Sequence, residues 1–222
     1  MIANFEFLIC TEMSYDMDKD IVRGVINRGI PAFLDRMEAE GVEMCDIYAR
    51  IIGFGDYSIG TDAVTVGEAL PVMKGGEYYG TSALEAALDG LSFIGGVGRC
   101  NALEALYAAL ATPSCGTTGR TRRIIILLAE SEVLPLEAHL QLDGYVGDAP
   151  DSMAELARWI DGKDPRRKRP MTALTLALIS DRGENRKIKD SLTELPLTLV
   201  STPDDAEFAL STVGYGILFE DW

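Results

Sequence analysis

The chain has 222 residues, with 35 acidic and 20 basic side chains and a formal net charge of -15 at pH 7. This acidity argues against a nucleic-acid binder, whose surface should be basic. It favours a soluble protein with a cationic partner; the alternative is a solvated acidic surface that binds nothing. No apolar run reaches the ~20 residues of a membrane span, and no secretory signal is visible, so we expect a protein that does not bind membranes. The four cysteines are widely spaced and form no C-x-x-C pair, which favours a reduced, cytoplasmic setting.

The first predicted strand covers residues 5–9, a short apolar run rich in aromatic and branched side chains. Polar residues follow it directly and place Glu12, Ser14 and Asp16 in one loop. A helix over residues 19–39 is expected next, because apolar residues recur there at steps of three and four. Pro31 lacks a backbone N–H and is expected to kink this helix.

Strands and helices alternate along the rest of the chain. Further strands are predicted at residues 46–54, 62–66, 124–128, 172–179 and 196–200. Helices are predicted at residues 83–91, 103–110, 152–160, 185–192 and 204–212. This order indicates an α/β fold with a mainly parallel six-stranded sheet, one antiparallel edge strand (62–66) and helices on both faces. Nothing marks a linker, so residues 1–222 are interpreted as a single domain.

Acidic residues follow two of the predicted strands. The run at 124–128 is the most hydrophobic in the chain, and Glu130 and Glu132 come directly after it. Ligands of open α/β sheets bind at the carboxyl ends of the strands, where the strand order reverses. We therefore expect both glutamates to join the loop after residues 5–9 in one site.

Other features carry less functional information. The glycine loop around Gly95 and Gly96 does not have a nucleotide-binding fingerprint, which argues against a nucleotide binder. The single histidine, His139, is expected at the surface, with no partner that would make it catalytic. The basic loop at 166–169 is interpreted as solvated, with a docking patch as the alternative. Cys10 and Cys100 are expected to be buried hydrophobic residues; the alternative is that they pair or bind a soft metal.

The chain resembles the von Willebrand factor A (vWA) family. In that family the first strand ends in Asp-x-Ser-x-Ser, a Gly-Gly-Thr loop opens a central helix, and a later strand ends in Thr-Asp-Gly. These motifs form the metal-ion-dependent adhesion site (MIDAS), which holds Mg²⁺. Here Cys10 takes the aspartate position of the first motif, Glu12 and Ser14 take the serine positions, and Glu130 replaces the later aspartate.

The threonine of the glycine loop has no clear counterpart. Segment 88–106 is similar to that loop and its helix, and it places Arg99 or Cys100 at the threonine position. An alternative alignment uses residues 80–82, which preserves a threonine. The resemblance covers nearly the whole chain. Within the family, the chain is most similar to small bacterial vWA proteins of the tellurium-resistance-associated type.

These substitutions indicate a degenerate metal site, because Mg²⁺ requires oxygen ligands in near-octahedral geometry and Cys10 is a soft ligand. No cofactor is expected. The alternative is a retained Mg²⁺ or Mn²⁺ bound by Glu12, Ser14 and Glu130.

The resemblance and the clustered carboxylates together predict a non-enzymatic protein-interaction module with no catalytic residues. Its partner-binding residues would be Glu12, Ser14, Asp16, Glu130 and Glu132. The partner would be another protein that offers a basic segment, within a bacterial stress-response, signalling or defence complex. The alternative is a divalent-metal-dependent binding protein or a metal-assisted hydrolase that uses the same carboxylates.

Overall fold

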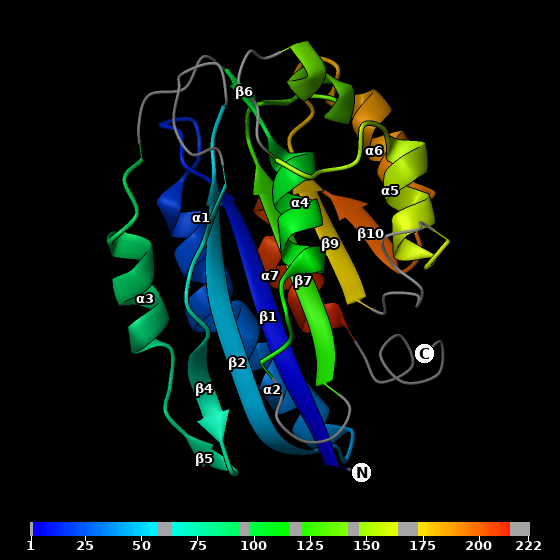
Figure 1. The fold of residues 1–222 in the computed structure, drawn as a ribbon. Coiled ribbons are helices and arrows are strands. Elements are labelled where there is room, and N and C mark those ends of the chain that lie inside the picture. Colours follow the sequence, from blue (N-terminus) through cyan, green and yellow to red (C-terminus); the bar gives the residue numbers. More distant parts are fainter. Residues whose placement is uncertain are drawn as a thin grey trace.

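The computed structural model describes residues 2–56, 64–93, 98–115, 121–141, 147–163 and 173–213. It shows an α/β fold in which a mixed, mostly parallel sheet is covered by helices on both faces (Figure 1). The strands of the main sheet are β1 (Ile2–Glu12), β2 (Glu43–Phe54), β3 (Val64–Val66), β4 (Leu70–Lys74), β5 (Glu77–Tyr78), β7 (Thr121–Ala129), β9 (Ala173–Ile179) and β10 (Thr198–Ser201). Two short strands, β6 (Arg99–Cys100) and β8 (Glu132–Val133), form a separate parallel pair.

The helical elements come between these strands. The α-helices are α1 (Lys19–Gly24), α2 (Ile30–Ala39), α3 (Ser82–Asp89), α4 (Ala102–Ala111), α5 (Met153–Ile160), α6 (Asn185–Thr193) and α7 (Ala206–Thr212). A π-helical turn, η1 (Val25–Gly29), joins α1 to α2, and 3-10 turns form η3 (Leu136–Gln141) and η4 (Pro203–Asp205). In the part of the chain that the structure describes, no helix has the length and apolar character that crossing a bilayer requires.

The strand order of the main sheet is β10-β9-β7-β1-β2-β4-β5, with β3 also paired to β2. The first five strands of this order are mutually parallel. β3 and β4 each pair antiparallel with β2, and β5 pairs antiparallel with β4. All six expected strands are present, but the expected number was wrong because the main sheet has eight strands among the described residues. The missed strands give weak sequence signals: β4 contains Pro71, which is unfavourable in a strand, and β5 has only two residues.

The centre of the sheet is the pair β1 and β7. They lie side by side in parallel register, with Phe7 opposite Ile124 and Ile9 opposite Ile126. This confirms the expectation that residues 5–9 and 124–128 are adjacent. From β1 the chain first adds β2 on one side and later adds β7 and β9 on the other. The order therefore reverses between β1 and β7, at the edge where their carboxyl ends meet.

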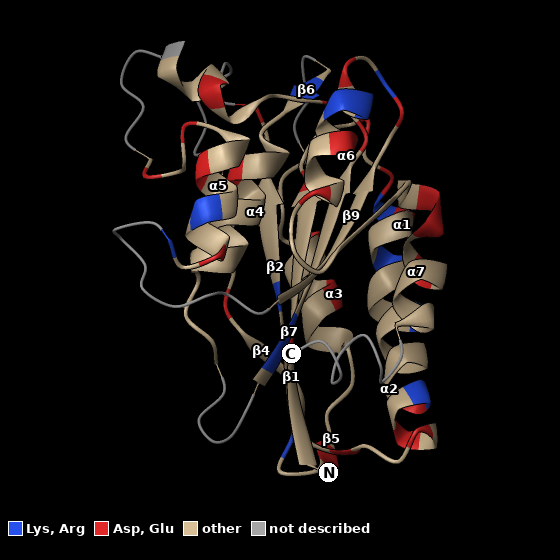
Figure 2. Cartoon of the chain, turned by 90° about the vertical axis from the view of Figure 1, so that its right-hand side faces the viewer, with Lys and Arg blue, Asp and Glu red and all other residues tan. Residues whose placement is uncertain are grey.

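Both faces of β1 are buried, which explains why its apolar residues point to both sides of the sheet. Phe5 and Phe7 pack edge-on against Phe33 of α2, with ring centroids 5.2 and 5.3 Å apart. Leu8 and Cys10 point to the opposite face and join the core under α4. Figure 2 shows the two layers on either side of the sheet, with α1, α2 and α7 on one side and α4 and α5 on the other.

The long helix expected over residues 19–39 is present as α1, η1 and α2 in direct succession. Asp18 caps its start by accepting the backbone N–H of Asp20 at 2.8 Å. The expected interruption by Pro31 takes the form of the π-helical turn η1, which ends directly before α2. A wider turn accommodates the proline, because the ring of Pro31 cannot donate a hydrogen bond and would clash in a regular α-helix.

Candidate functional site

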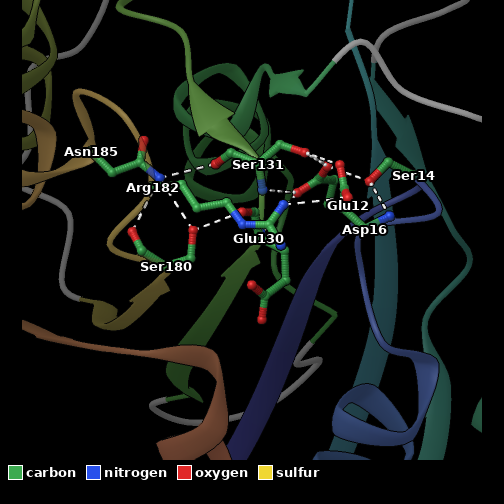
Figure 3. A network of polar contacts seen from close by, with 8 residues as sticks. All are labelled: Glu12, Ser14, Asp16, Glu130, Ser131, Ser180, Arg182 and Asn185. Carbon is green, nitrogen blue, oxygen red and sulfur yellow. Dashed lines mark hydrogen bonds and ion pairs between the residues drawn. The ribbon is translucent and has the colours of Figure 1, made fainter.

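The candidate site lies at the carboxyl edge of the sheet, where β1 and β7 end. Figure 3 shows the residues that form it. They come from the loop after β1, the loop after β7 and the segment between β9 and α6: Glu12, Ser14, Asp16, Glu130, Ser131, Ser180, Arg182 and Asn185. The site therefore coincides with the point where the strand order reverses.

Glu12, the last residue of β1, forms the base of the site. Its side chain is completely buried. The Oε2 atom accepts the backbone N–H groups of Glu130 and Ser131, both at 2.9 Å. The Oε1 atom accepts the hydroxyl of Ser14 at 2.5 Å and the hydroxyl of Ser131. A buried carboxylate is tolerated only when it is fully hydrogen-bonded, and these four donors meet that requirement.

A second buried side chain, Asn185 at the start of α6, joins three chain segments. Its Nδ2 atom donates to the backbone oxygens of Ser131 at 3.0 Å and Ser180 at 3.1 Å. Its Oδ1 atom accepts the backbone N–H of Val133 at 2.7 Å. The hydroxyl of Ser180 donates to the backbone oxygen of Glu130 at 2.7 Å. The ends of β7 and β9 are thereby fixed to each other and to α6.

The outer layer of the site is charged and reaches solvent. Arg182 forms an ion pair with Asp16 at 3.3 Å, and both side chains are substantially exposed. The Glu130 side chain points away from the Glu12 carboxylate (Figure 3). Burial raises the pKa of Glu130; Arg182 opposes this shift, while the carboxylates of Asp204, Glu12 and Asp16 add to it. Glu130 is thus a partly buried acid whose surroundings disfavour its ionised form.

Glu132 lies at the other end of this layer. It is partly buried in β8, and its carboxylate accepts the backbone N–H of Glu184 at 3.4 Å. Gly183 makes this approach feasible, since its φ is +51° and a Cβ atom there would come within 2.9 Å of the Glu132 carboxyl carbon. The turn before α6 is therefore shaped around the Glu132 side chain.

The five residues predicted for partner binding divide into two groups. Glu12 and Ser14 are buried and form the base, whereas Asp16, Glu130 and Glu132 reach the surface. The structure thus brings the set together at the expected edge, and their role in binding stays a prediction. Because Glu12 and Ser14 are buried, a partner could directly contact only the outer carboxylates of Asp16, Glu130 and Glu132.

Sequence reasoning missed Ser131, Arg182 and Asn185. Ser131 had a usable signal, because it stands between the two glutamates that were selected. Arg182 and Asn185 follow a different strand, β9, and only the adjacency of β7 and β9 in the sheet brings them to the site.

The metal ligands proposed by the alternative interpretation, Glu12, Ser14 and Glu130, do not fit Mg²⁺ or Mn²⁺ in this arrangement. Both oxygens of Glu12 already accept hydrogen bonds, Ser14 donates to one of them, and the Glu130 side chain points elsewhere. A hard divalent cation needs several oxygen atoms that converge on one point. Among the described residues, no group of three or more histidine, cysteine or acidic side chains is placed to hold a metal.

Two further expectations are tested by burial. Cys10 and Cys100 are completely buried and are free thiols, which confirms that they act as small core residues and not as a disulfide. Burial raises the pKa of both thiols. The surface position expected for His139 was wrong: its Nδ1 lies 3.7 Å from buried Glu104 and its Nε2 lies 3.1 Å from Asp151.

The reason for the His139 error is local. His139 belongs to η3, which packs over α4, and polar partners on both sides of the ring make its burial tolerable. The glycine pair at 95–96 and the basic loop at 166–169 lie outside the described residues.

Comparisons with known proteins do not show a family for this chain. No protein-family model matches the chain. No curated protein matches it. Among solved structures, the chain is similar to the pilus adhesin SpaC from Lactobacillus rhamnosus GG, at 16% identity with a TM-score of 0.49. The open conformation of that adhesin gives 16% identity and a TM-score of 0.48. Both alignments cover 94% of this chain and 29% of the adhesin, so the chain spans under a third of the adhesin's length.

Proposed function

We propose that this chain is a vWA-like, non-enzymatic protein-interaction module that docks a partner on the carboxyl edge of its sheet. The observation that supports this most directly is the layered site. A rigid base formed by Glu12, Ser131 and Asn185 carries three outer carboxylates at the point where the strand order reverses. Ligands of open α/β sheets bind at this position.

The chemistry of the outer layer favours a basic partner segment. Asp16, Glu130 and Glu132 share this edge, and the raised pKa of Glu130 reports how unfavourable its charge is there, chiefly because of burial. A lysine or arginine from a partner would relieve the repulsion and increase the encounter rate. Such binding should weaken as salt is added, because screening reduces interactions between exposed charges.

The alternative, a metal-dependent binding protein or a metal-assisted hydrolase, is supported less well. Both versions need the carboxylates to present free oxygen atoms toward one ion. Here the carboxylate of Glu12 is occupied by four donors from the protein itself. We therefore propose an interaction that does not depend on a divalent cation. The bacterial stress-response, signalling or defence setting follows from the resemblance, and it belongs to the same proposal together with the cytoplasmic location expected from the sequence.

The experiment that tests this proposal is charge reversal at the exposed part of the edge, with Asp16→Lys and Glu130→Lys combined. The matched control is Glu38→Lys combined with Glu43→Lys, which changes the net charge equally near the opposite, amino-terminal edge of the sheet. Tagged proteins would be used to capture partners from cells of the source organism at low and high salt.

We expect the edge variant to lose a salt-sensitive partner that wild type and control retain, with melting curves that show folded protein in all three. Equal capture by the edge variant and wild type would show that partners bind elsewhere.

A further inference from the structure

Beside the acidic edge lies a cavity that the layered site does not use. Its volume is about 630 Å³, within the range of about 300–1,000 Å³ that is typical of ligand pockets. Three parts of the chain enclose it: β8 together with the segment that follows β8, the start of α5, and one face of α6. Glu132 belongs to its lining, so the cavity is continuous with the edge described above.

The inner walls of the cavity are apolar. Val133, Leu134 and Pro135 form the wall after β8, and Met153 and Ile188 line it from α5 and α6. These side chains are suited to contact an aliphatic chain, whose removal from water would drive binding. The walls also rest on fixed elements, because Val133 is held to Asn185 by a 2.7 Å hydrogen bond.

The face of α6 that lines the cavity is set by helical spacing. Residues 184, 187, 188 and 191 follow steps of three and four, so they lie on one side of the helix. This side offers a carboxylate at Glu184, an ammonium group at Lys187 and an aliphatic side chain at Ile188. The helix therefore contributes both apolar wall and charged rim.

The charges around the rim are unequal. The cations are Arg99 and Lys187, and the carboxylates are Glu132, Glu137 and Glu184. Both cations already face carboxylates: Lys187 pairs with Glu184, and Arg99 lies 4.0 Å from the buried carboxylate of Asp56.

Glu132 and Glu137 therefore leave the rim with an excess of negative charge, next to the carboxylates of Asp16 and Glu130. An apolar interior with a negative rim is complementary to an aliphatic residue flanked by lysine or arginine.

We infer that this cavity receives an aliphatic side chain of a basic peptide segment from the partner protein. The inference rests on the proposed function and extends it, since it names the part of the partner that is recognised. The acidic edge would hold the basic residues, and the cavity would take the apolar residue between them. Specificity would then come from the cavity, because charge alone recognises any basic chain.

The test uses three short peptides as probes, followed by ¹H–¹⁵N NMR titration of the full chain. The first is Lys-Leu-Lys-Leu-Lys, the second replaces its leucines with serine, and the third replaces its lysines with glutamate. We expect only the first to shift the backbone signals of Val133, Met153 and Ile188. Equal or stronger shifts with the glutamate peptide, or no shifts there with any peptide, would overturn the inference.

Two variants complete the test. Ala154→Trp fills the cavity from an exposed lining position and should weaken the lysine–leucine peptide at least about tenfold, a factor of the order contributed by burying one aliphatic side chain. Glu132→Gln with Glu137→Gln keeps the shape of the cavity, and it should weaken peptide binding less than Ala154→Trp does but reduce the salt dependence of that binding, because Asp16 and Glu130 stay charged. Unchanged affinity in Ala154→Trp would overturn the inference.

The edge variant Asp16→Lys with Glu130→Lys separates this inference from the proposed function. If that variant loses the cellular partner while no peptide enters the cavity, the proposed function stands and the inference fails. If the leucine of the peptide occupies the cavity but partner capture is unchanged in the edge variant, the inference stands and the proposed edge contact fails.

Discussion

The Glu12 carboxylate, at the end of β1, accepts the backbone N–H of Ser131, in the loop after β7, at 2.9 Å. This bond joins two neighbouring parallel strands at their carboxyl ends, across the point where the strand order reverses. The same side chain accepts the N–H of Glu130 at 2.9 Å. Glu12 is thus an internal support for the loops after β1 and β7. The negative charges that face solvent come from Asp16, Glu130 and Glu132 around it.

Removing this support should destabilise the protein. Glu12→Ala leaves two backbone N–H groups and two hydroxyls without their buried acceptor, and we expect the free energy of unfolding to fall by about 2–4 kcal/mol. Urea unfolding followed by circular dichroism measures this change. The control, Glu43→Ala, replaces an exposed glutamate at the start of β2 and should change stability by no more than about 0.5 kcal/mol. Equal effects of the two substitutions would contradict the structural role of Glu12.

The charge of Glu130 should lower stability at neutral pH. Its pKa in the folded protein lies above its ordinary value of 4.5, chiefly because of burial, so the folded state binds the proton more tightly than the unfolded state. The contribution is favourable at low pH and is lost as the pH rises through the folded-state pKa. Glu130→Gln should therefore be more stable than wild type near pH 7, by less than about 1 kcal/mol because the group is partly exposed and screened by solvent.

The pH dependence provides the check on this prediction. Urea midpoints of wild type and Glu130→Gln should converge as the pH falls below about 4, where the carboxyl group is protonated in both states. Asp205, a fully exposed acid whose pKa is lowered by hydrogen bonds from Ser201 and Thr202, provides the opposite case. Asp205→Asn should be less stable than wild type at pH 7, and the difference should disappear as the pH falls through the lowered pKa of Asp205, where wild type loses this contribution. A Glu130→Gln protein that is less stable than wild type at pH 7 would show that Arg182 outweighs burial.

The fold could be predicted from the sequence because its signals are local or repeated. Residues 124–128 form an uninterrupted apolar run, and residues 5–9 form one that only Glu6 interrupts, which is typical of strands buried on both faces. The α1-η1-α2 helix has an apolar stripe, and it has a capping residue, Asp18, whose side chain accepts a backbone N–H of the first turn. The short strands β4 and β5 have neither a long run nor strict alternation, and their pairing depends on β2.

The site could be predicted only in outline. Strand ends are visible in the sequence, so the edge and its carboxylates could be named. Burial is set by packing, and nothing local distinguishes buried Glu12 from exposed Asp16, four residues later. The same applies to His139, whose partners Glu104 and Asp151 come from α4 and the approach to α5. Arg182 reaches the site through the pairing of β9 with β7, which the chain order does not reveal.

Divalent cations should leave the stability unchanged. A ligand that binds only the native state stabilises it by about 2.7 kcal/mol at 100 times its dissociation constant, which corresponds to a rise of several degrees in melting temperature. Because the Glu12 oxygens are occupied, melting temperatures in millimolar Mg²⁺ or Mn²⁺ should equal those in chelator. A concentration-dependent rise that Ser14→Ala abolishes would show that the loop after β1 rearranges to bind metal.

Arg182 should compete with the basic partner, because its guanidinium group already pairs with Asp16 at 3.3 Å. Arg182→Gln removes this internal cation. Exposed ion pairs contribute up to about 1 kcal/mol, so the variant should fold normally and bind the partner up to about fivefold more tightly at low salt. Titration of the captured partner against both proteins, at two salt concentrations, measures the difference.

The matched control for Arg182 is Arg36→Gln, which breaks another exposed pair, 3.0 Å from Glu40, on α2. It removes the same charge far from the carboxyl edge and should leave partner affinity unchanged within the general effect of net charge. The gain in Arg182→Gln should shrink with salt, since the exposed carboxylates are then screened. A loss of affinity in Arg182→Gln would mean that Arg182 itself contacts the partner, and the edge would then recognise an acidic segment in place of a basic one.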